Sequence, residues 1–234
     1  MVLYGTIING ITIVIGSLLG LFFSNIQERY KETVIHGVSL VVILIGLQMA
    51  LIADQIILVL MSILIGALIG ELMSLEANIN NVAKKLTSRL ETSNNDDIAQ
   101  AFITATLIFA IGAMAIIGAL DSGVRGDHEI LITKAIIDGF TALVLTTTLG
   151  YGVIFSAIPV VLYQGSIAIL ATQIEKIVPD HLLQGLITQI TAVGGLLIVA
   201  IGLNLLKVTH IRISNLLPAL LIVCIAFFVY ELFI

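Results

Sequence analysis

The sequence predicts an all-α, polytopic membrane protein, a transmembrane helical bundle of seven or eight spans. Hydrophobic residues make up 59% of its 234 residues and charged residues only 11%, against about 25% charged residues in an ordinary soluble domain. Apolar runs long enough to cross a bilayer recur along the chain. These runs lack the alternating pattern of barrel strands, so helices are the structure that would satisfy their backbone groups in lipid.

Each predicted span approaches the length of about 20 residues that crosses a hydrocarbon core of about 30 Å. An eighth segment, at 157–174, contains Pro159, Gln164 and Gly165, which predicts a broken helix that either spans or re-enters. The first segment has no basic stretch before it and is too long for a signal-peptide core, so we expect it to be retained. The seven clear segments are 4 to 23, 34 to 53, 56 to 73, 98 to 120, 131 to 153, 184 to 206 and 215 to 234.

The chain is expected to form a single integral membrane domain over 1–234, with a polar interruption after the third span. The first three spans occupy 1–76, a cytoplasmic amphipathic helix and linker occupy 77–97, and the remaining spans occupy 98–234. Apolar and basic residues in the interruption share a helical spacing, a pattern typical of a helix on an anionic membrane surface. They are Ile79, Val82, Leu86 and Leu90, with Lys84, Lys85 and Arg89 on the other faces.

The basic residues favour eight spans, because loops rich in lysine and arginine tend to stay cytoplasmic. With eight spans the division is seven against three, and with seven spans it is six against four. Eight spans with both termini outside is therefore the favoured arrangement. On the eight-span count, Arg29, Lys31, Lys84, Lys85, Arg89, Lys207 and Arg212 lie opposite Arg125, Lys134 and Lys176.

Three short stretches recur in the same order in the two halves, which suggests an internal repeat. Duplication and chance both stay open, because Leu, Ile and Gly are so common here. With eight spans, the first matched pair of helices would run parallel and the other two pairs antiparallel. The matches are TIINGITI (6–13) with AIIDGFTA (135–142), LIGLQM (44–49) with AIGLNL (200–205), and IGELM (69–73) with VYELF (229–233); they pair Asn9 with Asp138, Gln48 with Asn204, and Glu71 with Glu231.

Asp138 is the leading candidate for a binding residue. It lies about 10 Å inside its helix, too deep to reach water by snorkelling, and a charged residue at the bilayer centre costs about 3 kcal/mol or more. Two interpretations stay open. Asp138 forms an ion pair with Lys134 or Arg125 that packs helices, or it is a cation or proton site. In the second case Asn9, Thr141 and Thr148 would complete its shell, the two threonines lying on the same helix face.

The segment after this helix supplies further candidates. Pro159 removes a backbone donor and Gly165 loosens the helix, so free carbonyls beside Ser156, Tyr163 and Gln164 would bind a cation or polar substrate. A kink covered by neighbouring helices is the alternative.

Other polar and small residues are weaker candidates for a site. The outer loop with Asp121, Arg125 and Asp127 forms either a gate or a hairpin held by local ion pairs. Gln48, Asn204 and Glu71 are secondary polar positions. The GxxxG patterns at 16–20 and 66–70 permit close helix approach, either within the chain or in a homo-oligomer.

Patterns typical of enzymes and of nucleic-acid binding do not occur in this sequence. It contains no HExxH, GxSxG or Walker A motif in a suitable context, and the net charge of −5 is spread over short loops rather than gathered on one face. Cys224 is the only cysteine, so neither an intramolecular disulfide nor a cysteine metal site can form. We expect no enzymatic activity, no metal, no cofactor and no nucleic-acid partner.

Five short motifs of the C-terminal half form a recognisable pattern: GD (Gly126, Asp127), KxxxDG (Lys134, Asp138, Gly139), GxGVxFS (150–156), Pro159 followed by YQG (163–165), and IGLNLL (201–206). In these motifs the chain resembles the uncharacterised bacterial membrane-protein family that includes YqgA and YdfK. The resemblance extends to the N-terminal GTIINGITIVIGSLLGLFF. It implies a bacterial inner-membrane location and supplies no established activity, so the prediction of function rests on the residues.

Together these features predict a transporter or channel for a small solute or cation, with Asp138 as its ion or proton site. The lipid bilayer and the solute would be its partners. The alternative is a non-transporting scaffold or accessory subunit, in which the same polar groups only pack helices.

Overall fold

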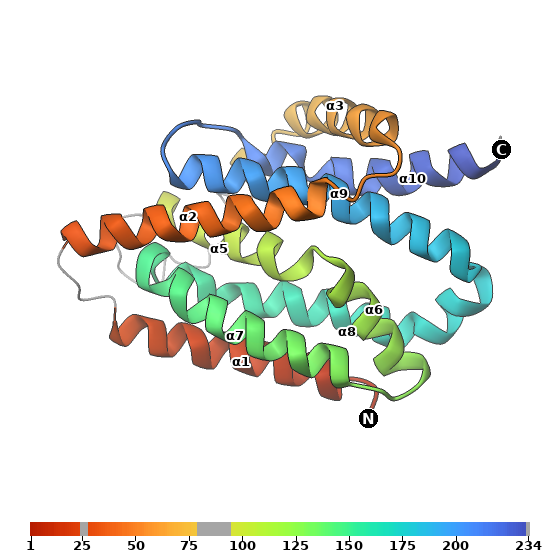
Figure 1. Ribbon diagram of the computed structural model, residues 1–234, viewed down its shortest axis with the longest axis horizontal. Helices are drawn as coiled ribbons and strands as arrows, with labels where there is room; N and C mark the ends of the chain where they lie inside the picture. Colours follow the sequence, from red (N-terminus) through yellow and green to blue (C-terminus); the bar gives the residue numbers. More distant parts are fainter. Residues whose placement is uncertain (24–27, 79–94, 233–234) are drawn as a thin grey trace. The chain divides into compact units, whose positions relative to one another are not determined.

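The computed structural model describes residues 1–23, 28–78 and 95–232 of the chain (Figure 1). Within these ranges the secondary structure is helical throughout, with no β-strand, so the predicted all-α class is confirmed. The predicted amphipathic segment with Ile79, Val82, Leu86 and Leu90 lies outside the described residues. The helices are α1 (Tyr4–Phe22), α2 (Glu28–Ala50), α3 (Ile56–Leu72), α5 (Asn95–Ala110), α6 (Ala113–Val124), α7 (Glu129–Leu149), the 3₁₀ helix η1 (Tyr151–Ser156), α8 (Ala157–Ile177), α9 (Asp180–Leu205), the 3₁₀ helix η2 (Ile213–Leu216) and α10 (Pro218–Leu232).

The eight predicted apolar segments all coincide with helices. Among the described residues, six helices are long and apolar enough to cross a membrane, and the bent pair α5–α6 makes a seventh. Helix α3, with 17 residues, is a shorter apolar helix, at the lower limit of about 17 residues for a span. The protein is therefore a multi-pass helical membrane protein by length and composition, and an eighth span stays a prediction.

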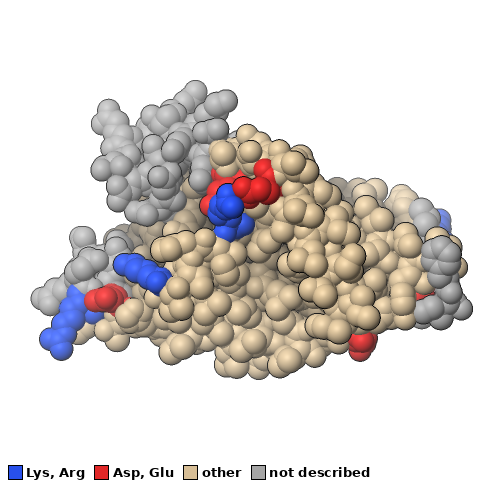
Figure 2. Space-filling view, turned by 90° about the horizontal axis from the view of Figure 1, so that it is seen from above, with Lys and Arg blue, Asp and Glu red and all other residues tan. Residues whose placement is uncertain are grey.

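The surface of the molecule supports the same class. Large apolar side chains are exposed along several helices, for example Ile136 at 68%, Leu162 at 64% and Leu221 at 71%. Among the described residues of the face in Figure 2, acidic and basic side chains form only a few small groups and other residues cover most of the surface. A helix with apolar residues on its outer surface is suited to lipid, because hydrocarbon tails are as apolar as leucine.

The broken helix predicted within 157–174 is wrong, because α8 runs without interruption from Ala157 to Ile177. Pro159 is the third residue of α8, in the first turn, where backbone N–H groups have no acceptor inside the helix, so the missing donor interrupts no bond. The break lies earlier in the chain. Helices α5 and α6 meet at an angle of 60°, and Gly112 at the junction has a φ of 140°, which favours glycine.

The chain folds as two compact units. Unit 1 comprises Met1–Ile35 and Asp97–Asp180, and unit 2 comprises His36–Asp96 and His181–Ile234. Each unit combines a piece of the N-terminal part with a piece of the C-terminal part, so the units do not follow the predicted division at 77–97. The single domain over 1–234 stays a prediction.

In unit 1, helices α1 and α7 lie side by side and run parallel (Figure 1). A Cβ atom added to Gly16 would collide with the backbone of Gly139, and one added to Gly20 would reach the backbone of Leu143. Because these contacts advance in the same direction along both helices, the two helices are parallel. The first GxxxG motif therefore serves close packing within the chain.

In unit 2, helices α2 and α9 pack antiparallel. Each close contact of one helix has a counterpart at the matched position of the other. A Cβ on Gly46 would meet Gly195 and Val199, and a Cβ on Gly202 would meet Ser39 and Ile43. The repeat equates Gly46 with Gly202, Ser39 with Gly195, and Ile43 with Val199. The two sets of contacts are thus related by exchange of the helices, as in a two-fold interface.

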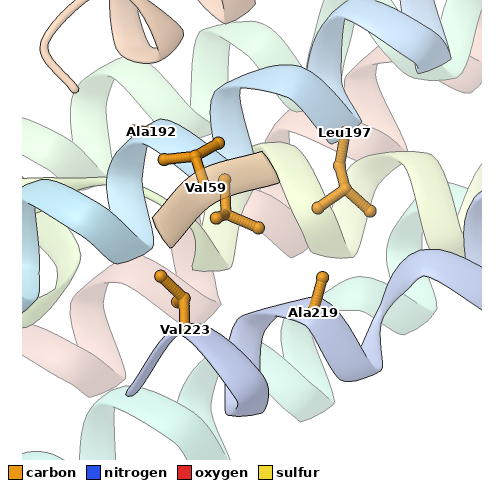
Figure 3. Packing of buried hydrophobic residues seen from close by; sticks show 6 residues of the cluster. Val59, Ala192, Leu197, Ala219 and Val223 are labelled. Carbon is orange, nitrogen blue, oxygen red and sulfur yellow. The ribbon is translucent and has the colours of Figure 1, made fainter. Parts of the chain in front are cut away.

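Helices α3 and α10 form the third matched pair, and their side chains pack with those of α9 in an apolar core of unit 2. Gly66 lies against Ala219 and Gly70 against Asn215, so this pair is also antiparallel. The relative directions of all three pairs agree with those expected from the repeat. Figure 3 shows side chains from three helices of this core pointing toward one another: Val59, Ala192, Leu197, Ala219 and Val223.

Candidate functional site

Five of the buried polar residues of unit 1 come from α1, α7 and α8, and we call these five the polar cluster. Helix α1 contributes Thr6 and Asn9, α7 contributes Lys134 and Asp138, and α8 contributes Gln164. Thr6, Asn9 and Gln164 are 0% exposed, Asp138 4% and Lys134 6%. The cluster therefore lies within the protein, although it is made of side chains that water would ordinarily solvate.

A chain of hydrogen bonds links the cluster across its helices. Asp138 Oδ2 accepts a bond from Lys134 Nζ at 2.5 Å and another from Asn9 Nδ2 at 3.0 Å. Asn9 Nδ2 also donates to Gln164 Oε1 at 3.2 Å. Since an amide nitrogen carries two hydrogens, Asn9 uses both of them to connect the carboxylate of α7 with the amide of α8.

Three atoms of the polar cluster have no hydrogen-bond partner among the described residues: Thr6 Oγ1, Asn9 Oδ1 and Gln164 Nε2. They provide one hydroxyl, one acceptor and one amide donor. Leaving a buried polar atom unsatisfied costs about 1–3 kcal/mol, so such atoms are uncommon in native structures unless they have a role. The cluster can therefore offer both donors and acceptors to a small polar ligand.

The two charges of the cluster neutralise each other. Lys134 and Asp138 form an i,i+4 ion pair, with side-chain exposures of 8% and 6%. In a low-dielectric interior the attraction is strong, but removing both groups from water offsets much of it. Of the two partners considered for Asp138, the structure shows Lys134. Arg125 instead pairs with Asp121 at 3.1 Å, so of the two alternatives the structure has the pair of Asp138 with Lys134.

The threonines and the serine predicted to complete the site have other partners or positions. Thr141 is half-buried on α7, one turn beyond Asp138. Thr148 Oγ1 donates to the Leu145 carbonyl oxygen at 2.9 Å, about 15 Å along the helix from Asp138 at 1.5 Å per residue. Ser156 Oγ donates to the Val153 carbonyl oxygen at 2.6 Å. The hydroxyl hydrogens of Thr148 and Ser156 thus return to their own backbone, a common arrangement in apolar helices.

The remaining candidates of unit 1 lie around the polar cluster or in the α6–α7 loop. Tyr163 is half-buried and precedes Gln164 on α8. Asp127 Oδ1 accepts the Glu129 backbone N–H at 3.0 Å, at the start of α7. With the Asp121–Arg125 pair, this contact supports the interpretation of the loop as a hairpin held by local interactions.

Gly165 has room for a side chain, which leads to a prediction. A Cβ there would lie 3.5 Å from Leu3 and 3.8 Å from Thr6, both ordinary van der Waals distances. We expect Gly165→Ala to leave the free energy of unfolding unchanged or to raise it by up to about 1 kcal/mol, because alanine favours a helix over glycine. Thermal melting of the purified protein in detergent tests this. A loss of stability would mean that this glycine is needed for more than space.

The secondary polar positions lie in unit 2, where two of them organise chain turns. Asn204 closes the turn after α9: its Nδ2 donates to the Ile211 carbonyl at 2.8 Å, and its Oδ1 accepts the Ile211 N–H at 2.9 Å. Glu71 accepts bonds from Arg212 at 2.6 Å and Asn215 at 2.7 Å. Gln48 is exposed.

Glu76, near Glu71 and Arg212, leads to a prediction about the pH dependence of stability. Burial raises the pKa of the Glu76 carboxyl above its ordinary value of 4.5, while Arg212 opposes the shift and Glu71 adds to it. The folded state thus holds this proton more tightly than the unfolded chain does. The protonated Glu76 carboxyl therefore stabilises the folded state below pH 4.5, and this contribution is lost as the pH rises through the pKa of Glu76 in the folded state.

We therefore expect Glu76→Gln to be more stable than the wild type at neutral pH, with the difference vanishing below pH 4.5. Melting curves recorded over a pH series measure this difference. Glu32→Gln, at an exposed position of α2, controls for the loss of one negative charge. A Glu76→Gln variant that is less stable at neutral pH would contradict the prediction.

The sequence indicated most of the polar cluster but not all of it. Asn9, Lys134, Asp138 and Gln164 were each candidates. Thr6 was missed, although it lies one turn before Asn9 and so shares its helix face. In unit 2, Asn215 was also missed; its Oδ1 accepts the Glu76 backbone N–H at 2.9 Å.

The fold and the buried polar cluster define a multi-pass helical membrane protein. The chain belongs to the family described as "Protein of unknown function (DUF554)", whose model matches residues 4–228. It is 33% identical over 236 residues to "Uncharacterized membrane protein YdfK" of Bacillus subtilis (strain 168), covering 99% of this chain and 98% of the relative. It is 29% identical over 223 residues to "Uncharacterized protein YqgA" of Escherichia coli (strain K12), covering 93% of each. No solved structure matches the chain significantly. The resemblance seen in the sequence motifs is thus confirmed.

Proposed function

We propose that this protein is a transporter or channel for a small solute or cation across the bacterial inner membrane, with Asp138 as the charged element of its binding site. The observation that carries the proposal is the polar cluster, in which side chains from three helices meet and three buried polar atoms have no partner among the described residues. Polar and ionisable groups inside membrane helices are expensive, and they commonly mark pathways for ions or substrates.

The depth of the cluster supports the proposal. Asp138 is the tenth of 21 residues in α7, and Gln164 is the eighth of 21 in α8. Asn9 is the sixth of 19 residues in α1. Each side chain is therefore well inside its helix, where binding sites of transporters are typically located.

The accompanying expectations form part of the same proposal. Both termini would lie outside, with eight spans. The partners would be the lipid bilayer and a small solute or cation, and the protein would have no enzymatic activity, cofactor or nucleic-acid partner. A homo-oligomer also belongs to the proposal, because apolar helix surfaces are available for it.

A scaffold or accessory subunit is the second candidate function. The observations that favour it are the Lys134–Asp138 pair, in which each charge already has a partner, and the close approach of α1 to α7 at Gly16 and Gly139. In that case the polar cluster would serve only to hold the three helices in register.

A thermal-stability screen of the purified protein against ions and small metabolites distinguishes the two functions. A ligand at about 100 times its dissociation constant should stabilise the folded state by about 2.7 kcal/mol. For a transporter, we expect this stabilisation to vanish in Asp138→Asn, which keeps the shape of the side chain. Asp121→Asn, at the partly exposed pair, is the matched control and should retain it. If no ligand shifts the wild type and Asp138→Asn is merely less stable, the scaffold function is supported instead.

A further inference from the structure

We infer that the species exchanged at the Lys134–Asp138 pair is a proton, so that the transport activity proposed above is proton-coupled. This inference rests on the proposed function, because a titrating pair has a role in transport only if a solute moves. It names the ion class of the site, where the fold alone leaves a metal cation and a proton as alternatives.

Two donors already occupy one oxygen of the Asp138 carboxylate. Asp138 Oδ2 already accepts bonds from an ammonium group at 2.5 Å and an amide group at 3.0 Å. The unpartnered atom of Gln164 is the amide nitrogen, which is also a donor. Hard metal cations need several oxygen ligands, and one bound at this carboxylate would lie close to the positive charge of the Lys134 ammonium. A proton needs neither a ligand shell nor a cavity.

Uptake of a proton changes the net charge of the Lys134–Asp138 pair. When the Asp138 carboxylate takes up one proton, it becomes a neutral carboxylic acid, and Lys134 keeps its positive charge. The pair changes from a net charge of zero to plus one, and its ion-pair attraction is lost. A buried ammonium without a counter-charge is unfavourable. Lys134 is the sixth residue of α7, and its long side chain can extend toward the nearby helix start. Release of the proton restores the pair.

The hydrogen-bond chain links this change to helices α1 and α8. The Asn9 amide donates to Asp138 with one hydrogen and to Gln164 with the other. A hydrogen bond to an ionised acceptor is about twice as strong as one between neutral groups. Protonation of Asp138 therefore weakens the hydrogen bond that joins α7 to α1. The Asn9 amide, which also bonds Gln164 on α8, is then held less firmly.

Other titratable groups on the neighbouring elements do not compete for this role. Helix α7 packs against α1, α6 and η1, and the cluster includes α8. Among the described side chains, Lys134 is the charged group bonded to Asp138. The others are Tyr4 on α1, which packs on His128; Asp121 on α6, which pairs with Arg125; Tyr151 on η1; and Tyr163 and Lys176 on α8.

Infrared difference spectra of the purified full-length protein, recorded between neutral and acidic pH, test the inference. A protonated buried carboxyl has a carbonyl stretching band that is distinct from the bands of carboxylates. We expect the band of one carboxyl to be lost in Asp138→Asn and to change frequency in Asp138→Glu, which retains a titrating group if the asparagine variant folds poorly. Asp121→Asn should keep the band. Spectra that do not differ between the wild type, Asp138→Asn and Asp138→Glu would overturn the proton site.

A parallel stability screen with sodium, potassium and magnesium salts separates this inference from the proposed function. If a metal cation stabilises the wild type but not Asp138→Asn, and no Asp138 band titrates, the site binds a cation and only the proton assignment fails. If neither effect occurs, the proton assignment fails, and the proposed function is then decided by the screen against small metabolites described above. If the band titrates, solute uptake into vesicles should increase several-fold when a pH gradient is imposed, and this increase should be lost in Asp138→Asn. Uptake that is independent of the gradient would refute the coupling.

Discussion

Replacing Lys134 with methionine is expected to destabilise the protein by about 3–5 kcal/mol, the usual consequence of removing one partner from a buried ion pair. Methionine retains most of the side-chain volume, so the change removes chiefly the charge and the hydrogen bond to Asp138. The Asp138 carboxylate would then keep only the bond from Asn9 in surroundings where it is 4% exposed.

A second substitution shows whether the loss comes from the unpaired charge. In Lys134→Met combined with Asp138→Leu, both charges are absent, and we expect most of the stability to return, because buried pairs can often be replaced by apolar residues at little cost. The non-additivity of the two changes, measured by melting or chemical unfolding in detergent, reports the coupling.

The exposed pair supplies the matched control. Arg125 bonds Asp121 with the same four-residue spacing, but its side chain is 71% exposed. We expect Arg125→Met to change stability by no more than about 1 kcal/mol, as is usual for surface pairs. Equal losses in Arg125→Met and Lys134→Met would show that burial does not control the strength of the Lys134–Asp138 interaction.

Adding a side chain at Gly16 is expected to separate α1 from α7. The first atom of any side chain there would collide with the backbone of Gly139, and backbone cannot move aside as a flexible side chain can. We expect a loss of about 1–3 kcal/mol for Gly16→Ala, and a larger loss for Gly16→Val, since overpacking of this kind is destabilising. The Asn9–Asp138 hydrogen bond joins the same two helices and should weaken with them.

Gly37 on α2 is the control for this series, because a Cβ there would meet nothing within 4 Å. Gly37→Ala should be neutral or stabilise the protein by up to about 1 kcal/mol, the difference in helix propensity. The melting temperatures of the four variants, with alanine and valine at each position, measure the contrast. If Gly16→Ala melts like Gly37→Ala, the close packing of α1 on α7 does not contribute to stability.

The positions of the helices could be predicted from the sequence because the length of an apolar run is a local property. Each of the eight runs is helical, since a chain in lipid must satisfy its backbone hydrogen bonds within the segment, although the run at 98–120 is divided between α5 and α6. The predicted break in α8 was wrong for an equally local reason. The effect of Pro159 depends on where the helix begins, and its position in the first turn makes the missing donor harmless. The actual break lies at Gly112, where no proline indicates it in the sequence.

The polar cluster could be predicted in part. The depth of Asp138 required a partner, and the repeat matched it with Asn9, which the structure places at hydrogen-bond distance. Lys134 followed from helical spacing, whereas the choice between Lys134 and Arg125 depended on where the α6–α7 loop turns. The hydrogen bond from Asn9 to Gln164 could not be foreseen. It depends on the rotation of two helices, and the two residues are 155 positions apart in the sequence.

The sequence by itself determined the membrane environment of the chain, the positions of its helices and the presence of charge deep within apolar helices. Hydrophobicity and helical periodicity act over a few turns, so they can be read along one segment at a time. The tertiary structure alone decided which polar atoms find partners and which do not. Thr6 Oγ1, Asn9 Oδ1 and Gln164 Nε2 are left without a partner among the described residues because close helix packing orients the side chains, and that packing depends on contacts between segments far apart in the chain.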